Sequence, residues 1–192
     1  MRTNLRCRAL RGSHFGLGRI RSEFPGWLDL RLSGYEYNFA IPGFLASQYE
    51  DIVRSSLLSN PQYLSFQSTL REVLQDDADW VVIWLGANEF RARYGALTEG
   101  EPPETLIERL VSDLRQVIEF VQRQKTNLKV VLANLPDLNA APDKRVSQPD
   151  PAKRARVTAA TRQANAAIAA LASSKGVAVA DVFAQTERLV TG

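Results

Sequence analysis

Polar residues that can donate hydrogen bonds follow an apolar run near the middle of the chain. The run covers residues 80–85 and stops at Gly86, Ala87, Asn88 and Glu89. Such a run is typical of a strand buried on both faces, and its end lies at the sheet edge where open α/β folds bind ligands. We therefore expect the Asn88 amide to donate to a substrate oxygen. In the alternative interpretation, the Asn88 side chain only caps the next segment.

A second candidate donor is the backbone N–H of Gly43. Residues 35–40 predict a short strand, and residues 41–43 (Ile-Pro-Gly) predict a turn that leads into a helix ending near Leu58. The N–H groups in the first turn of a helix have no acceptor within the helix, so the Gly43 N–H can donate to an anionic group. In the alternative interpretation, Gly43 is present only for its backbone conformation.

Strands and helices alternate along the rest of the chain. The predicted helices begin at Pro25, Gly43, Pro61, Pro103 and Pro151, and the predicted strands cover residues 35–40, 79–85, 129–135 and 177–183. Alternating arginines favour an exposed edge strand in residues 1–18. Polar loops are expected at residues 91–103 and 138–148. This order predicts one domain over residues 1–192, a three-layer α/β/α fold with a parallel sheet.

Composition excludes several classes of protein and site. Hydrophobic residues make up 45% and charged residues 23%, with a net charge of +3, as in ordinary soluble globular proteins. The arginine clusters lack interleaved aromatics, so no nucleic-acid partner is expected. The single cysteine, Cys7, and the single histidine, His14, exclude a disulfide and a Cys/His zinc site, and neither a metal nor a cofactor is expected. No membrane span or signal peptide is visible, which leaves localisation and oligomeric state open.

Three motifs together resemble the SGNH hydrolases, also called the GDSL esterase/lipase family. Residues 86–89 are similar to the Gly-x-Asn-Asp motif of that family, with Glu89 in place of aspartate. Residues 37–43 are similar to the segment with the family's second glycine, and residues 130–137 to its next strand. The resemblance covers about residues 24–183 and implies a flavodoxin-like sheet of the SGNH hydrolase type.

The resemblance implies an acyl-ester hydrolase that acts on a small-molecule ester through a serine nucleophile. Ser13 has the sequence position of that serine, although Arg-Gly-Ser replaces the family's Gly-Asp-Ser. The implied oxyanion hole consists of the Asn88 side-chain amide, the Gly43 N–H and the N–H of the serine. Each donor fixed at the oxyanion is worth roughly 10² to 10³ in rate.

The sequence departs from the family pattern at the catalytic base. The family carries it in an Asp-x-x-His motif near the C-terminus, and the sequence contains none. His14 is adjacent to Ser13, whereas triad partners converge from different loops, so His14 reads as a core or surface histidine. We expect a truncated chain, a wrong start or an impaired relative, which leaves open whether the chain is an active enzyme.

Two other functions remain as alternatives. One is a non-catalytic relative of the same fold that binds acyl or glycan ligands. The other is a nucleotide-binding flavodoxin-like or Rossmann protein, which ranks last because neither a Walker sequence nor a complete glycine fingerprint is present.

Overall fold

The computed structural model describes residues 4–9, 35–54 and 61–191, and the predicted helix at Pro25 lies outside these ranges. Within them, five strands form one sheet in the order β2-β1-β3-β4-β5. The strands are β1 (Asn4–Ala9), β2 (Tyr35–Asn38), β3 (Trp80–Trp84), β4 (Lys129–Ala133) and β5 (Ala178–Ala180). Parallel strands β3, β4 and β5 are connected through helices, so the predicted α/β class is confirmed.

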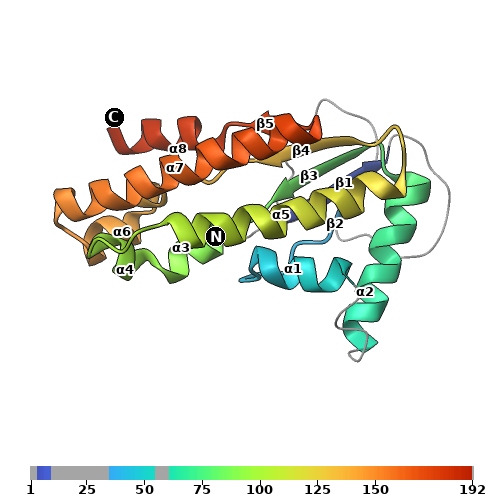
Figure 1. Ribbon diagram of the computed structural model, residues 1–192, viewed down its shortest axis with the longest axis horizontal. Helices are drawn as coiled ribbons and strands as arrows, with labels where there is room; N and C mark the ends of the chain where they lie inside the picture. The colour runs from blue at the N-terminus through green and yellow to red at the C-terminus, as the bar shows by residue number, and fades with distance from the viewer. Residues whose placement is uncertain (1–3, 10–34, 55–60, 192) are drawn as a thin grey trace.

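Helices supply most of the described residues. They are α1 (Ala46–Val53), α2 (Pro61–Glu72), the π-helical turn η1 (Val73–Asp77), α3 (Ala87–Ala92), α4 (Tyr94–Thr98), α5 (Glu104–Gln124), the 3₁₀ turn η2 (Leu138–Ala140), α6 (Pro142–Ser147), α7 (Pro151–Lys175) and α8 (Val182–Thr191). The long helices α5 and α7 lie over one face of the sheet (Figure 1). None of the helices in the described part of the chain is long and apolar enough to cross a membrane.

Strand β1 differs from the prediction in both position and direction. It lies between β2 and β3, not at an edge, and it pairs antiparallel with both of them. The strands β3, β4 and β5 pair in parallel as predicted. An alternating polar pattern shows which faces of a strand are covered and not how many strands it pairs with, which is why the edge prediction was wrong.

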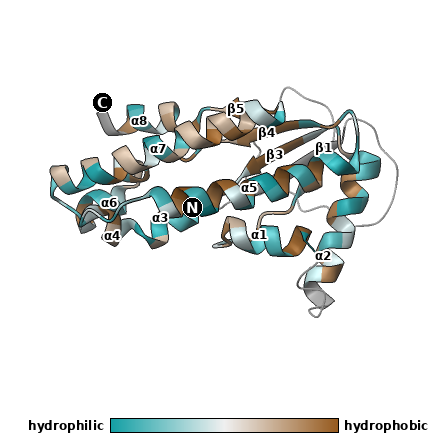
Figure 2. Ribbon diagram, viewed as in Figure 1, coloured by the Kyte–Doolittle hydropathy of each residue, from teal (hydrophilic) through white to brown (hydrophobic). Residues whose placement is uncertain are grey.

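The core lies on one face of the sheet, under helices α5 and α7 (Figure 1). The buried side chains of β3 and β4 alternate with half-buried ones, and both strands are brown in Figure 2. The core residues of this face are Val81, Ile83, Val130 and Leu132 from the strands, Leu114, Val117 and Ile118 from α5, and Ala164 and Ile168 from α7. This packing fixes the end of β3, after which the candidate residue Asn88 lies.

The two long helices agree with their sequence signals. Helix α5 starts after Pro103 as predicted. Helix α7 is capped by the Asp150 side chain, which accepts from the backbone N–H of Ala152 at 2.8 Å. It stops at Gly176, whose φ of +64° is the left-handed conformation that ends helices.

Three other predictions were wrong in their local structure. Residues 91–103 and 138–148, predicted as loops, contain the short helices α4 and α6 and the turn η2. The last strand ends at Ala180, and helix α8 begins where the strand was expected to continue. The helix that was expected to begin at Gly43 or just after it starts at Ala46, in agreement with the prediction.

Candidate active site

The loop after β2 places Gly43 in a tight turn. The Phe44 N–H donates to the Ile41 carbonyl at 3.2 Å, and Pro42 and Gly43 occupy the two central positions. Proline followed by a glycine at φ +82° defines a type II turn, so glycine is required here for its backbone conformation. Among the described residues, a Cβ at Gly43 would meet nothing within 4 Å. The Gly43 N–H therefore belongs to an exposed turn and not, as predicted, to the first turn of a helix.

Tyr49, on helix α1, anchors the start of this turn from the protein interior. Its hydroxyl accepts from the Ile41 N–H at 2.8 Å and donates to the Phe39 carbonyl at 2.9 Å. The side chain is fully buried, and burial raises the pKa of Tyr49 to about 12, while the bond from Ile41 acts in the opposite direction. The neutral hydroxyl can thus serve as donor and acceptor at once.

The loop after β3 carries Asn88 to the same place. Gly86 has a φ of +105°, and this lets the chain turn sharply from β3 into helix α3. Asn88 follows in the first turn of α3 and is buried. Its Nδ2 donates to the carbonyl oxygen of Phe44 at 2.8 Å. The structure thus brings together two residues that are 45 positions apart in the sequence, Asn88 and Gly43, through the neighbour of Gly43.

Glu89 makes a second bond between α3 and α1. Its Oε1 accepts a short hydrogen bond from the backbone N–H of Ala46, the first residue of α1. Burial raises the pKa of Glu89, and the bond from Ala46 opposes that shift. Its other oxygen, Oε2, is buried and has no hydrogen-bond partner among the described residues.

The arrangement offers hydrogen-bond donors without a built metal site. No group of three or more metal-ligating side chains occurs in the described ranges 4–9, 35–54 and 61–191. The polar groups that lie close together are the Asn88 side-chain amide and the main chain of the turn that contains Gly43. Such donors are suited to stabilising negative charge on an oxygen atom.

A comparison with protein-family models matches residues 13–190 to the GDSL-like Lipase/Acylhydrolase family. The chain belongs to this family. Comparisons with curated proteins and with solved structures found no match. Membership in the GDSL-like family confirms the resemblance drawn from the sequence motifs and indicates, at the level of the family, an acyl-ester hydrolase.

The GDSL-like motif at residues 86–89 contains one residue whose contact the sequence did not reveal. Glu89 stands where the family has aspartate, and it is largely buried against α1. Its partner Ala46 lies 43 residues earlier in the chain, so no local pattern could indicate the contact. The only available signal was the replacement of the family's aspartate by glutamate, which extends the side chain by one methylene.

Two other sequence-predicted residues are not placed. Ser13, the predicted nucleophile, and its neighbour His14 lie outside the described residues. The GDSL-like match begins at residue 13 and thus includes both. Their roles remain predictions from the family resemblance.

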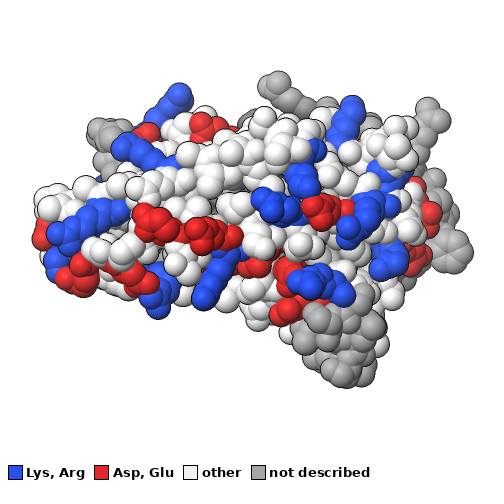
Figure 3. Space-filling model, in the orientation of Figure 1, with Lys and Arg blue, Asp and Glu red and all other residues white. Residues whose placement is uncertain are grey.

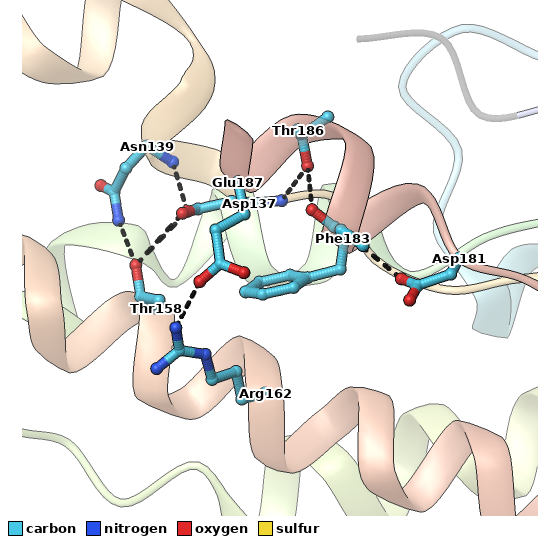
Figure 4. Close-up of polar contacts among 9 residues, drawn as sticks. Asp137, Asn139, Thr158, Arg162, Asp181, Phe183, Thr186 and Glu187 are labelled. Atoms are coloured by element: carbon cyan, nitrogen blue, oxygen red, sulfur yellow. Dashed lines mark hydrogen bonds and ion pairs between the residues drawn. The ribbon is translucent and has the colours of Figure 1, made fainter. Parts of the chain in front are cut away.

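A separate polar cluster joins the end of β4 to helices α7 and α8 (Figure 4). Asp181 accepts from the Ala184 N–H at 3.0 Å and from Asn134 Nδ2 at 2.9 Å, and these two bonds lower the pKa of Asp181. The Asp137 carboxylate accepts from the Asn139 N–H at 2.9 Å, and Arg162 of α7 pairs with Glu187 of α8. The side chains of this cluster form hydrogen bonds with loop N–H groups and with one another, which indicates a structural role.

Proposed function

We propose that the chain is an acyl-ester hydrolase of the serine type in which Asn88 and the Gly43 turn provide the oxyanion hole. The observation that carries this proposal is the 2.8 Å bond from Asn88 Nδ2 to the Phe44 carbonyl, because it fixes the amide beside the glycine turn. A small-molecule ester is the proposed substrate, as the family indicates.

The proposed reaction follows the chemistry of acyl transfer. The Ser13 oxygen bonds to the ester carbonyl carbon, the C–O bond to the alcohol breaks, and the serine proton passes to the leaving alkoxide. Water then adds to the acyl-serine, which releases the acid and returns a proton to the serine oxygen. Negative charge develops on the carbonyl oxygen in both steps, and fixed N–H donors lower the barrier by stabilising it. No metal is needed for any of these steps.

The two donors can be assigned to individual atoms. The side-chain amide of Asn88 is the first proposed donor, and its bond to the Phe44 carbonyl sets the position of that amide beside the turn. The turn's own hydrogen bond uses the Phe44 N–H, so the turn does not engage the Gly43 N–H. Among the described residues, a Cβ at Gly43 would meet nothing within 4 Å.

The decisive test is the substitution Asn88→Ala, assayed on p-nitrophenyl acetate and butyrate. We expect kcat to fall by roughly 10² to 10³ with little change in KM, since the lost donor acts on the transition state. Gln67→Ala is the matched control. Gln67 is another buried amide that donates to the α1 segment, at 2.6 Å to the Ile52 carbonyl, but at the opposite end of the helix. We expect its kcat to stay within about threefold of the wild type.

Labelling of the serine separates this function from a binding role. A fluorophosphonate should modify the wild-type chain and not Ser13→Ala if Ser13 is the nucleophile. A wild-type chain that binds acylated sugars or fatty acids, yet neither hydrolyses esters nor takes the label, would contradict the hydrolase and support the non-catalytic alternative.

A further inference from the structure

We infer that Glu89 is a positioning residue that holds the Gly43 turn against Asn88, an inference that rests on the proposed function. It acts through the main chain of α1 and does not contact the reacting atoms. Its bond to Ala46 and the Asn88 bond to Phe44 together fix the segment that follows Gly43.

The two bonds have complementary polarity. Asn88 and Glu89 are consecutive in α3, and they contact Phe44 and Ala46, which are two positions apart in the other segment. Asn88 donates to a carbonyl, whereas Glu89 accepts from an N–H. A segment held by one donor and one acceptor has little freedom to slide or rotate, so the pair sets the place of the turn relative to the amide.

The burial of Glu89 indicates that this carboxylate has a specific structural partner and is not an ordinary surface charge. The Ala46 N–H is one of the unsatisfied donors at the start of α1, where the helix dipole also favours an anion. Water or an exposed cap would satisfy that donor without cost. The carboxylate is instead desolvated, which raises its pKa, and within the described residues Oε2 has no hydrogen-bond partner.

The other polar side chains that hold the turn among the described residues belong to α1 itself. The preceding N–H, that of Leu45, is taken by Gln48 Oε1 at 2.9 Å, a contact within α1 itself. Tyr49 holds the residues before the turn, and it too belongs to α1. Asn88 and Glu89 are therefore the described polar side chains that tie the turn to α3.

Hydrogen exchange of individual amides tests the link without requiring turnover. We expect Glu89→Ala to accelerate exchange at Phe44 and Ala46 by about tenfold or more relative to the Ile118 amide in α5, because the helix start is released. Glu89→Gln keeps an acceptor oxygen of the same reach and should stay within about threefold of the wild type. Glu89→Asp, one methylene shorter, should behave like Glu89→Ala. Gln67→Ala should accelerate the Arg54 amide at the other end of α1 and leave Phe44 unchanged.

Ester hydrolysis by the same variants tests whether the link serves the oxyanion hole. Misplacing a catalytic group by about 1 Å can cost up to 10² in rate, so we expect kcat to fall about 10- to 100-fold in Glu89→Ala and Glu89→Asp, with KM within about threefold. We expect Glu89→Gln to keep kcat close to that of the wild type. A purely structural role would lower the fraction of folded enzyme and would not separate Glu89→Gln from Glu89→Asp.

The outcomes distinguish this inference from the proposed function. Unchanged exchange at Phe44 and Ala46 in Glu89→Ala would overturn the inference whatever the activity. An equal loss of kcat in Gln67→Ala and Glu89→Ala would also overturn it, since any loosening of α1 would then suffice. A wild-type chain without ester turnover, combined with faster exchange in Glu89→Ala, would refute the hydrolase and leave Glu89 as the residue that positions the turn.

Discussion

At the scale of single residues, Gly43 and Gly86 share a left-handed backbone but differ in what surrounds them. In the part of the chain that the structure describes, a Cβ at Gly43 would meet nothing within 4 Å. A Cβ at Gly86 would lie 2.8 Å from Leu135 Cδ2 and 2.9 Å from Leu110 Cδ1, and both leucines are fully buried. Gly86 is therefore needed for space as well as for conformation, whereas Gly43 is needed for conformation alone.

This difference predicts unequal costs for the two substitutions to alanine. We expect Gly43→Ala to lower the free energy of unfolding by about 1 kcal/mol, the cost of a side chain at positive φ. Gly86→Ala carries the same strain and must also displace packed leucines, for a total of about 2–3 kcal/mol. Urea unfolding monitored by tryptophan fluorescence measures both, and equal costs would contradict the close approach at Gly86.

The residue scale also shows what the sequence could indicate about the site. Asn88 was found because a buried strand ends two residues before it, and Gly43 because a Pro-Gly pair predicts a turn. The hydrogen bonds that connect the two segments, from Ala46 to Glu89 and from Asn88 to Phe44, join residues 43 and 44 positions apart along the chain. Such contacts depend on the packing of α1 against α3, which no local pattern encodes.

At the scale of elements, α1 is the part that carries the glycine turn, and Tyr49 is its internal anchor. Tyr49→Phe removes one hydroxyl and leaves the Ile41 N–H and the Phe39 carbonyl without their partner. We expect a loss of about 1–3 kcal/mol in the free energy of unfolding and faster amide exchange at Ile41. Chemical unfolding and exchange measured by NMR report the two effects.

Tyr94→Phe is the matched control for this substitution. The Tyr94 hydroxyl is also buried and donates to Asn139 Oδ1 at 2.6 Å, far along the chain from the turn. We expect a similar loss of stability with unchanged exchange at Ile41. If Tyr49→Phe leaves Ile41 exchange unaltered as well, the hydroxyl does not anchor the turn.

The elements that the sequence predicted well are those with strong local signals. Helix α7 has an aspartate cap, a proline in its first turn and a glycine stop, and α5 has a long apolar stripe. Helices α4 and α6 are only five and six residues long, too short to form alone. Tertiary bonds stabilise α4, such as that from Arg156 to the Thr98 carbonyl at 2.9 Å, and these do not appear in a local pattern.

At the scale of the whole molecule, the sequence predicted the fold class from the order of its elements and missed the arrangement of one strand. Parallel pairing of β3, β4 and β5 follows from the helices that connect them. The antiparallel position of β1 between β2 and β3 depends on which strand edges remain open after those pairs form. That is a property of the assembled sheet, so it could not be predicted from residues 4–9.

The distribution of charge is also a property of the assembled molecule. Lys and Arg side chains are interspersed with Asp and Glu over the face shown in Figure 3. Between α1 and α5, however, acidic groups gather: Glu50 and Asp51 on α1 face Asp113 on α5. Burial, followed by the charges of Glu50 and Asp51, raises the pKa of Asp113 to about 6, and Arg109 only partly offsets this.

The raised pKa of Asp113 predicts that the free energy of unfolding falls as pH rises. The unfolded chain binds a proton at Asp113 with a pKa near 3.9, so between about pH 4 and 6 the folded state binds more protons than the unfolded state. The cost of the charged carboxylate is absent below pH 4 and complete above pH 6. We expect Asp113→Asn to raise the free energy of unfolding by about 0.5–1 kcal/mol at pH 8, after allowance for solvent screening, and by almost nothing at pH 4.

Urea unfolding at pH 4 and pH 8 measures this dependence. Glu108→Gln makes the same change of charge at an exposed position of α5 and serves as the control. We expect it to change stability by less than about 0.5 kcal/mol at either pH. An increase in the free energy of unfolding that is equal at both pH values would show that Asp113→Asn acts through packing. Only ionisation of the Asp113 carboxyl makes the increase disappear in acid.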